Sequence, residues 1–414
     1  MWLIGTKARP PTICERCAEV LRAAPTWVRY LRAVVGVRRI AAPLVLALVF
    51  IALAIDVLIS SVPVGVDFHT YEAAAQVGLN QGWTRIYDQA LVAAEQRRLV
   101  PDQLTQPFIS PPTVAWLAAA LAWLPYWWAY YVWAAATLAA LAVALMWSAT
   151  SHGLPRWIAA GAAIAPWWVL YAVHLGQVGP LVAAAIVLAW RLVRDDRSVV
   201  AGLVLSLILL KPNTAFLVPF ALLAAARYRV FAVWAVVGAA LSGVAFLTLG
   251  THGTTAYLGQ LTGQLPTGAA WLTVEGALGV SGLVAMTVRL LIVSAALIAA
   301  FRLRGSPGLV IVAGILGSLL ATPYLHASDL CLLAAAAWIV WEECQSPAWR
   351  LPLAAGWLAA SPLAGLINLA PTLSRWALVE VALLAALVFE AWRPGRERGA
   401  ALTPGAELRT RAPA

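Results

Sequence analysis

Residues 126–147 read YWWAYYVWAAATLAALAVALMW, twenty-two residues without a charged side chain. As an α-helix this stretch would be about 33 Å long, which matches the roughly 30 Å hydrocarbon core of a bilayer. Similar apolar stretches follow one another along most of the chain, and 62% of its 414 residues are hydrophobic while only 11% are charged. Soluble domains carry about 25% charged residues, so the composition excludes a soluble, a disordered or a secreted disulfide-rich protein. We expect an all-α, polytopic membrane protein.

The apolar stretches predict about twelve membrane-spanning helices. Nine are clear and three are shorter, and they occupy residues 40–62, 126–147, 157–173, 178–193, 199–212, 214–226, 230–250, 279–301, 308–325, 330–341, 351–371 and 376–392. The stretch 111–124 would be only about 21 Å long as a helix, so we interpret it as re-entrant or membrane-lying rather than as a full span. An even number of spans places both termini on one side of the membrane.

The basic residues identify that side. With twelve spans, 22 of the 28 Arg and Lys residues fall on the side of the termini and four on the other. Cytoplasmic loops collect Arg and Lys, so the net charge of +10 reflects topology rather than nucleic-acid binding. We therefore expect a plasma-membrane protein with a basic cytoplasmic tail (1–39), a membrane domain (40–392) and a cytoplasmic C-terminal tail (393–414).

Two long extracytoplasmic loops are expected, at 63–110 and 251–278. In the first loop, residues 71–79 and 90–99 are expected to form short amphipathic helices whose apolar faces suit the membrane surface. In the N-terminal tail, Cys14 and Cys17 form a CxxC pair, but no second pair or nearby His completes the four ligands of a zinc site.

Asp67, in the stretch PVGVDFHTY (63–71), is one of few ionisable residues near membrane depth. Such residues are functional candidates by default, and a carboxylate beside apolar surface has its pKa raised toward that of a useful base. Alternatively, Asp67 caps a helix that begins near Thr70 or Tyr71. His69 is expected to project from the same loop, and Asp88 is interpreted as a helix cap.

Lys211, in LLKPN (209–213), is the only lysine in a membrane segment. Its short flanking segments predict a broken helical pair with Lys211, Pro212 and Asn213 at the apex, and broken helices at this depth normally border a cavity. A cation there can bind an anionic ligand such as phosphate. The alternative is that the side chain snorkels to the interface.

Two further polar stretches lie at the outer ends of predicted helices. His326, in ATPYLHASD (321–329), can bind phosphate or a metal, and Asp329 is placed to orient it. Gln177 lies in a glycine-flanked turn, HLGQVG (174–179). The spacing of His69, His174 and His326 does not indicate a metal site.

A carboxylate, an intramembrane lysine and several histidines are thus expected on one side of the membrane. A base for a hydroxyl acceptor and cations for a phosphate leaving group are what glycosyl transfer from a lipid phosphate requires. The chain has no P-loop or glycine-rich nucleotide motif, so a nucleotide-sugar donor is not expected. The alternatives are a transporter or flippase of a lipid-linked saccharide and a structural scaffold.

Short motifs follow one another along the chain: Asp-Phe-x-x-Tyr at 67–71, Gly82 before Tyr87-Asp88, Phe-x-x-Pro-Pro at 108–112, Leu124-Pro125, Gly176-Gln177, Leu-Lys-Pro-Asn at 210–213 and Pro-Tyr-x-His at 323–326. In the order of these motifs the chain resembles glycosyltransferase family 87. That family comprises polyprenol-phosphate-mannose-dependent α-1,2-mannosyltransferases of the GT-C superfamily.

The resemblance implies a GT-C-type helical bundle that transfers mannose from a polyprenyl-phosphate donor to a hydroxyl of a glycan or glycolipid. It implies an inverting displacement on the extracytoplasmic face, without a metal or another cofactor. Asp67 would be the general base, and Lys211 and His326 would bind the donor phosphate. The substrate-pocket candidates are His69, Tyr71, Gln177, Asn213 and Tyr324.

Overall fold

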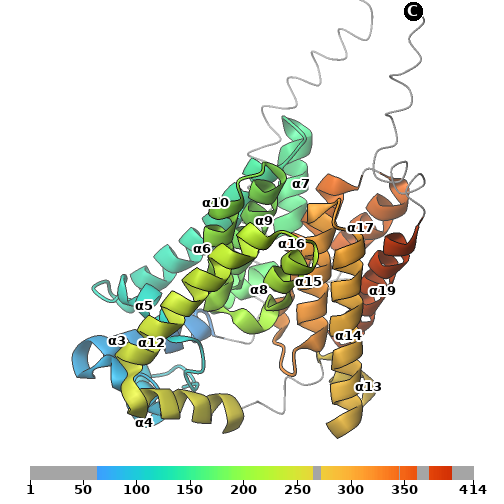
Figure 1. The fold of residues 1–414 in the computed structure, drawn as a ribbon. Coiled ribbons are helices and arrows are strands. Elements are labelled where there is room, and N and C mark those ends of the chain that lie inside the picture. The colour runs from blue at the N-terminus through green and yellow to red at the C-terminus, as the bar shows by residue number, and fades with distance from the viewer. Residues whose placement is uncertain (1–62, 264–271, 345, 361–372, 394–414) are drawn as a thin grey trace, which may run out of the picture.

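The computed structural model describes residues 63–263, 272–344, 346–360 and 373–393, and every regular element in these ranges is helical (Figure 1). The predicted all-α class is therefore confirmed for the described residues. The tail 1–39 with Cys14 and Cys17, the predicted span 40–62 and the chain from residue 394 onward lie outside them. The helices are α3 (Val66–Gln81), η1 (Trp83–Arg85), α4 (Gln89–Leu99), α5 (Pro112–Ala119), α6 (Tyr126–Ser148), α7 (Leu154–Ile164), α8 (Trp167–Leu175), α9 (Gly179–Arg194), α10 (Ser198–Leu205), η2 (Ser206–Leu210), η3 (Pro212–Thr214), α11 (Leu217–Ala224), α12 (Tyr228–Gly263), α13 (Val274–Leu278), α14 (Gly282–Arg302), α15 (Pro307–Ala321), η5 (Ala327–Leu330), α16 (Cys331–Glu343), α17 (Pro347–Ala360) and α19 (Leu373–Trp392).

Three described helices are long and apolar enough to cross a membrane, namely Tyr126–Ser148, Tyr228–Thr262 and Gly282–Arg302. A fourth candidate is the pair Pro155–Ile164 and Trp167–Leu175, which is bent by 62°. The chain therefore has the apolar helices of a membrane protein, whereas the number of about twelve spans stays a prediction.

The segment expected to span the membrane at 157–173 is not one unbroken helix. Helix α7 ends at Ile164 and α8 begins at Trp167, with Pro166 between them. The helical path is interrupted at Pro166, whose ψ of 134° is not helical and whose nitrogen has no N–H for the helical ladder.

The second predicted loop, 251–278, is largely helical where it is described. Helix α12 continues to Gly263 beyond a kink at Gly250, whose φ of 61° and ψ of −171° interrupt the helix. Residues Val274–Leu278 form α13, and residues 264–271 lie outside the described ranges. A glycine explains the kink because this backbone conformation is strained for any residue with a Cβ.

The first predicted loop contains both expected helices, within α3 and α4. The expectation that α3 presents an apolar face to the membrane surface is wrong, because eleven of its sixteen residues are buried within the protein. Helix α5 has eight residues, about 12 Å, which is too short for a full span.

The remaining helices pack side by side, with α3, α4 and α5 gathered at one end of the bundle (Figure 1). Helices α11, α14 and α15 approach closely because α15 carries glycines at the crossings. A Cβ on Gly314 would lie 2.7 Å from Val218 Cα, and one on Gly317 would lie 2.6 Å from Ala296 Cβ. Small residues at such crossings are typical of helices packed in membranes.

Candidate active site

One glutamine joins the acidic and basic side chains at the α3 end of the bundle. Gln177 lies in the turn between α8 and α9, and its Nε2 donates a hydrogen bond to Asp67 Oδ2 at 2.5 Å. Its Oε1 accepts hydrogen bonds from Lys211 Nζ at 2.8 Å and from Tyr71 Oη at 3.0 Å. Side chains from three distant parts of the sequence therefore form a single hydrogen-bonded chain.

Two glycines hold the start of α3 against the end of α8. Gly176 ends α8 with a φ of 76°, and a Cβ there would lie 2.6 Å from Phe68 Cβ. Gly65 precedes α3 with a φ of 73°, and its N–H donates to His174 O at 2.8 Å. Tyr126 Oη donates to Gly65 O at 2.9 Å. Positive φ and close backbone approach both favour glycine, so these residues bring Asp67 to Gln177.

Helical spacing decides which side chains of α3 reach the site. Asp67 and Tyr71 are four residues apart and both contact Gln177. His69 is two residues from Asp67, about 200° around the helix, and its Nε2 contacts Gln96 O of α4 at 2.7 Å. The expectation that His69 projects with Asp67 from a loop is therefore wrong, because this stretch is a helix and the two side chains lie on different sides of it.

The alternative role of Asp67 as a helix cap is also wrong. Helix α3 begins at Val66, before the expected start near Thr70 or Tyr71, and Gly65 occupies the N-cap position. Asp67 thus lies in the first turn, with its side chain directed to Gln177. Asp88 is a cap as expected, since its Oδ1 accepts hydrogen bonds from the N–H groups of Ala90 and Leu91.

Lys211 lies between η2 and η3, where proline interrupts the helical path, and its ammonium forms an ion pair with Asp329 Oδ1. The lysine side chain is 14% exposed and that of Asp329 is fully buried. Lys211 is therefore turned toward a buried carboxylate and an amide oxygen, and it does not snorkel to the interface.

The Asp329 carboxylate contacts the backbone N–H of His326. Its Oδ2 accepts a hydrogen bond from the His326 N–H at 2.8 Å, because His326 directly precedes η5 and its N–H has no helical partner. The expected orientation of the ring by Asp329 is thus replaced by a contact between His326 Nε2 and Tyr324 Oη. The imidazole of His326 is exposed.

Two sequence expectations remain apart from this hydrogen-bonded chain. Asn213 lies half-buried in η3 and takes no part in the hydrogen bonds around Gln177 in the described residues. His69, His174 and His326 do not converge, and the described ranges contain no group of three or more His, Cys, Asp or Glu side chains that could hold a metal ion.

Three neighbouring groups affect the pKa of Asp67 through their charge: the Lys211 ammonium, the His326 imidazole and the Asp329 carboxylate. Burial raises the pKa of Asp67, and the nearby Asp329 carboxylate raises it further. The charges of Lys211 and His326 and the hydrogen bond from Gln177 act in the opposite direction. Asp67 is thus a more basic carboxylate than usual, hydrogen-bonded to Gln177 and within electrostatic reach of Lys211, which suits a group that must accept a proton.

A comparison with models of known protein families assigns the chain to one of them. The family model for glycosyltransferase family 87 matches residues 108–362, more than half of the sequence. The chain belongs to glycosyltransferase family 87. A search of curated proteins and a search of solved structures each found no match.

The site of this family 87 glycosyltransferase extends across the edge of the matched region. Gln177, Lys211 and Asp329 lie inside the matched residues 108–362, whereas Asp67 and Tyr71 precede them. The hydrogen bonds of Gln177 therefore connect the family region to the α3 segment before it.

Sequence reasoning missed that Asp329 is the counter-ion of Lys211. A signal was available, because a lysine buried among apolar helices needs an opposite charge and Asp329 is one of few carboxylates near the predicted outer helix ends. It also missed Trp133, whose Nε1 donates to Gly176 O at 2.8 Å and supports the turn that carries Gln177. A tryptophan in an apolar helix gives no such signal.

Proposed function

We propose that this family 87 enzyme transfers a sugar from a polyprenyl-phosphate donor to a hydroxyl group of a glycan or glycolipid. The sugar we propose is mannose. The observation that carries this proposal is the bridge formed by Gln177 between Asp67 and Lys211. A carboxylate and an ammonium that both hydrogen-bond to the side-chain amide of Gln177 lie close enough to act on the two sides of a single glycosidic bond.

In the proposed step, Asp67 is the general base. The acceptor hydroxyl oxygen attacks the anomeric carbon, its proton passes to the Asp67 carboxylate, and the bond between that carbon and the phosphate oxygen breaks. The polyprenyl phosphate leaves with the electron pair, which inverts the configuration at the anomeric carbon. The raised pKa of Asp67 supports this role, since general bases work best with a pKa near the operating pH.

Lys211 and His326 are proposed to bind the donor phosphate. An ammonium has three N–H donors, and Gln177 and Asp329 engage two of those of Lys211 in the described part of the chain. The third is free to bind a phosphate oxygen as negative charge develops on it. His326 is exposed beside Tyr324 and can donate a further hydrogen bond to the phosphate.

We infer that this site faces the extracytoplasmic side of the plasma membrane and that the termini are cytoplasmic. The support is the distribution of Arg and Lys along the sequence. A lipid-linked donor also suits a site carried by apolar helices, because its polyprenyl chain stays in the bilayer. Nothing in the described structure favours the alternative of a transporter or flippase.

The test is the Asp67→Asn variant in membranes supplied with labelled polyprenyl-phosphate mannose. Loss of the general base is expected to lower the transfer rate by roughly 10²- to 10⁴-fold while donor binding is retained. Transfer is measured by the label in the glycan product, which mass spectrometry also identifies. Unlabelled polyprenyl-phosphate glucose, added as competitor, tests the choice of sugar.

Asp88→Asn is the matched control. Asp88 is a nearby carboxylate that caps α4, and asparagine caps helices equally well, so this variant should transfer at the wild-type rate. Wild-type transfer by Asp67→Asn would remove Asp67 from its proposed role.

A further inference from the structure

Three aromatic side chains from two distant parts of the sequence stack on one another. The Tyr87 ring stacks with that of Phe108, at 5.3 Å between ring centroids, and with that of Tyr257, at 4.7 Å. Tyr87 and Phe108 are buried and belong to the segment between α3 and α5, whereas Tyr257 is half-buried and belongs to α12. No step of the proposed transfer uses these rings, so their arrangement needs an explanation of its own.

The kink in α12 brings Tyr257 to this aromatic cluster. Beyond Gly250 the helix continues at the end of the bundle that carries α3 and α4 (Figure 1). A Cβ on Gly253 would lie 2.7 Å from Thr84 O of η1, so a glycine is needed for this close approach. Tyr257 follows Gly253 by four residues and therefore lies on the same face of the helix. The glycines of α12 thus place the Tyr257 ring against the cluster.

Hydrogen bonds connect the cluster to Gln177. Tyr87 Oη donates to Ser110 O at 2.7 Å. Burial raises the pKa of Tyr71 well above its usual value, and a hydrogen bond from the Ser110 side chain acts in the opposite direction. Tyr71 Oη in turn donates to Gln177 Oε1 at 3.0 Å. These contacts lead from α12 to the amide that is hydrogen-bonded to Asp67.

The contacts bear on the orientation of the Gln177 amide. Its Oε1 accepts from Tyr71 and from Lys211, so its Nε2 is the end that faces Asp67 and donates to it. If Tyr71 shifts, the amide loses one of the two donors that fix this orientation. The hydrogen bond from Gln177 lowers the pKa of Asp67, so a loosened amide would let that pKa rise.

We propose that Tyr257 is a positioning residue for sugar transfer. Its ring holds Tyr87, and the hydrogen bonds that begin at Tyr87 hold the Gln177 amide against Asp67. Aromatic rings suit this task, because they have few rotatable bonds and because stacked pairs stabilise one another beyond the area that they bury. This inference rests on the proposed role of Asp67 as the general base, and it makes the end of α12 part of the active-site assembly.

The test is Tyr257→Leu, assayed as the full chain in membranes supplied with labelled polyprenyl-phosphate mannose. Leucine is apolar but cannot stack, so kcat should fall by roughly five-fold with little change in KM for the donor. The acid limb of the pH–rate profile should move to higher pH, because Gln177 no longer holds its full hydrogen bond to Asp67. A ring that serves only stability would not move this limb.

A second variant tests the next contact and keeps the aromatic stack. Tyr87→Phe retains the ring and removes the hydrogen bond to Ser110 O. It should lower kcat and move the acid limb in the same direction as Tyr257→Leu. If Tyr257→Leu does not fold, an unshifted limb in Tyr87→Phe would still contradict the inference.

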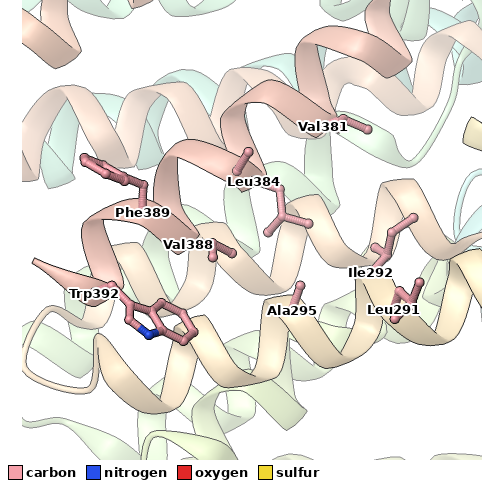
Figure 2. Close-up of a pocket in the computed structure, with 9 residues that line it drawn as sticks. Leu291, Ile292, Ala295, Val381, Leu384, Val388, Phe389 and Trp392 are labelled. Atoms are coloured by element: carbon pink, nitrogen blue, oxygen red, sulfur yellow. The ribbon is translucent and has the colours of Figure 1, made fainter.

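One conservative variant and two matched controls complete the test. Tyr257→Phe keeps the ring and should recover most of both losses. Phe231 is a half-buried ring near the other end of α12, in contact with Phe220 and Trp234, so Phe231→Leu should keep the wild-type kcat and acid limb. Phe389 lines the apolar groove between α14 and α19 (Figure 2), and Phe389→Leu should do the same.

Three outcomes would overturn the inference. They are a wild-type kcat and acid limb in Tyr257→Leu, equal losses in Tyr257→Leu and Tyr257→Phe, and a rise in KM for the donor with kcat unchanged. The proposed function fails by a different result, which is wild-type transfer by Asp67→Asn. A fully active Tyr257→Leu beside an inactive Asp67→Asn would remove only the positioning role.

Discussion

Carboxylates lie at both ends of helix α16, and their partners differ. Asp329, just before the helix, pairs with Lys211, which shares Gln177 with Asp67. At the other end, about 20 Å away, Glu343 Oε1 accepts hydrogen bonds from Trp190 Nε1 at 2.8 Å and from the Gly308 N–H at 3.1 Å. Glu342 Oε2 accepts one from the Thr150 N–H at 2.7 Å.

The difference lies in the charge of the partners. Glu342 and Glu343 accept hydrogen bonds from two backbone N–H groups, the Thr150 hydroxyl and a tryptophan. Asp329 pairs with the Lys211 ammonium, which shares Gln177 with the half-buried Asp67. We therefore expect substitutions at the Glu343 end to lower stability alone and substitutions at the Asp329 end to lower sugar transfer as well.

The largest combined effect on transfer and stability is expected at Lys211. Lys211→Gln should lower transfer by roughly 10²- to 10³-fold, the usual loss when one donor to a developing negative charge is removed. It should also destabilise the fold by about 3–5 kcal/mol, because Asp329 is left buried without its counter-ion. Transfer assays and thermal unfolding in detergent measure the two effects.

The double variant Lys211→Gln/Asp329→Asn separates them. Removing both charges should recover most of the unfolding temperature while transfer stays low. If transfer returned together with stability, Lys211 would be only a structural partner of Asp329.

A smaller loss is expected for Gln177→Leu. Leucine cannot hold Asp67 and Lys211 in place, so kcat should fall by roughly ten-fold, which corresponds to about one lost hydrogen bond, with little change in KM for the donor. Gln76→Leu is the matched control, because Gln76 contacts Ala122 O away from the site. A rise in KM alone would show that Gln177 binds substrate rather than positioning the catalytic groups.

At the opposite end of α16, Glu343→Met should cost about 1–3 kcal/mol of stability, because Trp190 Nε1 and the Gly308 N–H lose their acceptor. Glu343→Gln keeps an acceptor oxygen and should be close to the wild type. The specific activity of the folded fraction should be unchanged in both variants. A loss of transfer without a loss of unfolding temperature would contradict the contrast between the two ends.

The smallest effect concerns pH. Transfer needs Asp67 deprotonated, so the rate should fall as the pH drops through a pKa that lies above the ordinary 3.8. The hydrogen bond from Gln177 lowers this pKa, and removing it raises the pKa. The acid limb of the pH–rate profile in Gln177→Leu should therefore lie at higher pH than in the wild type. An unshifted limb would indicate that Asp67 is not the titrating base.

Apolar stretches and charge distribution were sufficient to predict an all-α membrane protein, and Lys211 stood out because a cation at membrane depth is costly. The breaks at Pro166 and Gly250 were harder to predict, because proline and glycine also occur inside spanning helices.

Only the tertiary structure decided which residues form the site. Asp67, Gln177, Lys211 and Asp329 are dispersed over more than 260 positions, and no local pattern states that one amide bridges them. His69 was misplaced because its direction depends on whether residues 66–71 are loop or helix. Hydropathy is a property of each segment by itself, whereas a hydrogen-bonded site depends on how the segments pack, and the close approaches at Gly65 and Gly176 set that packing.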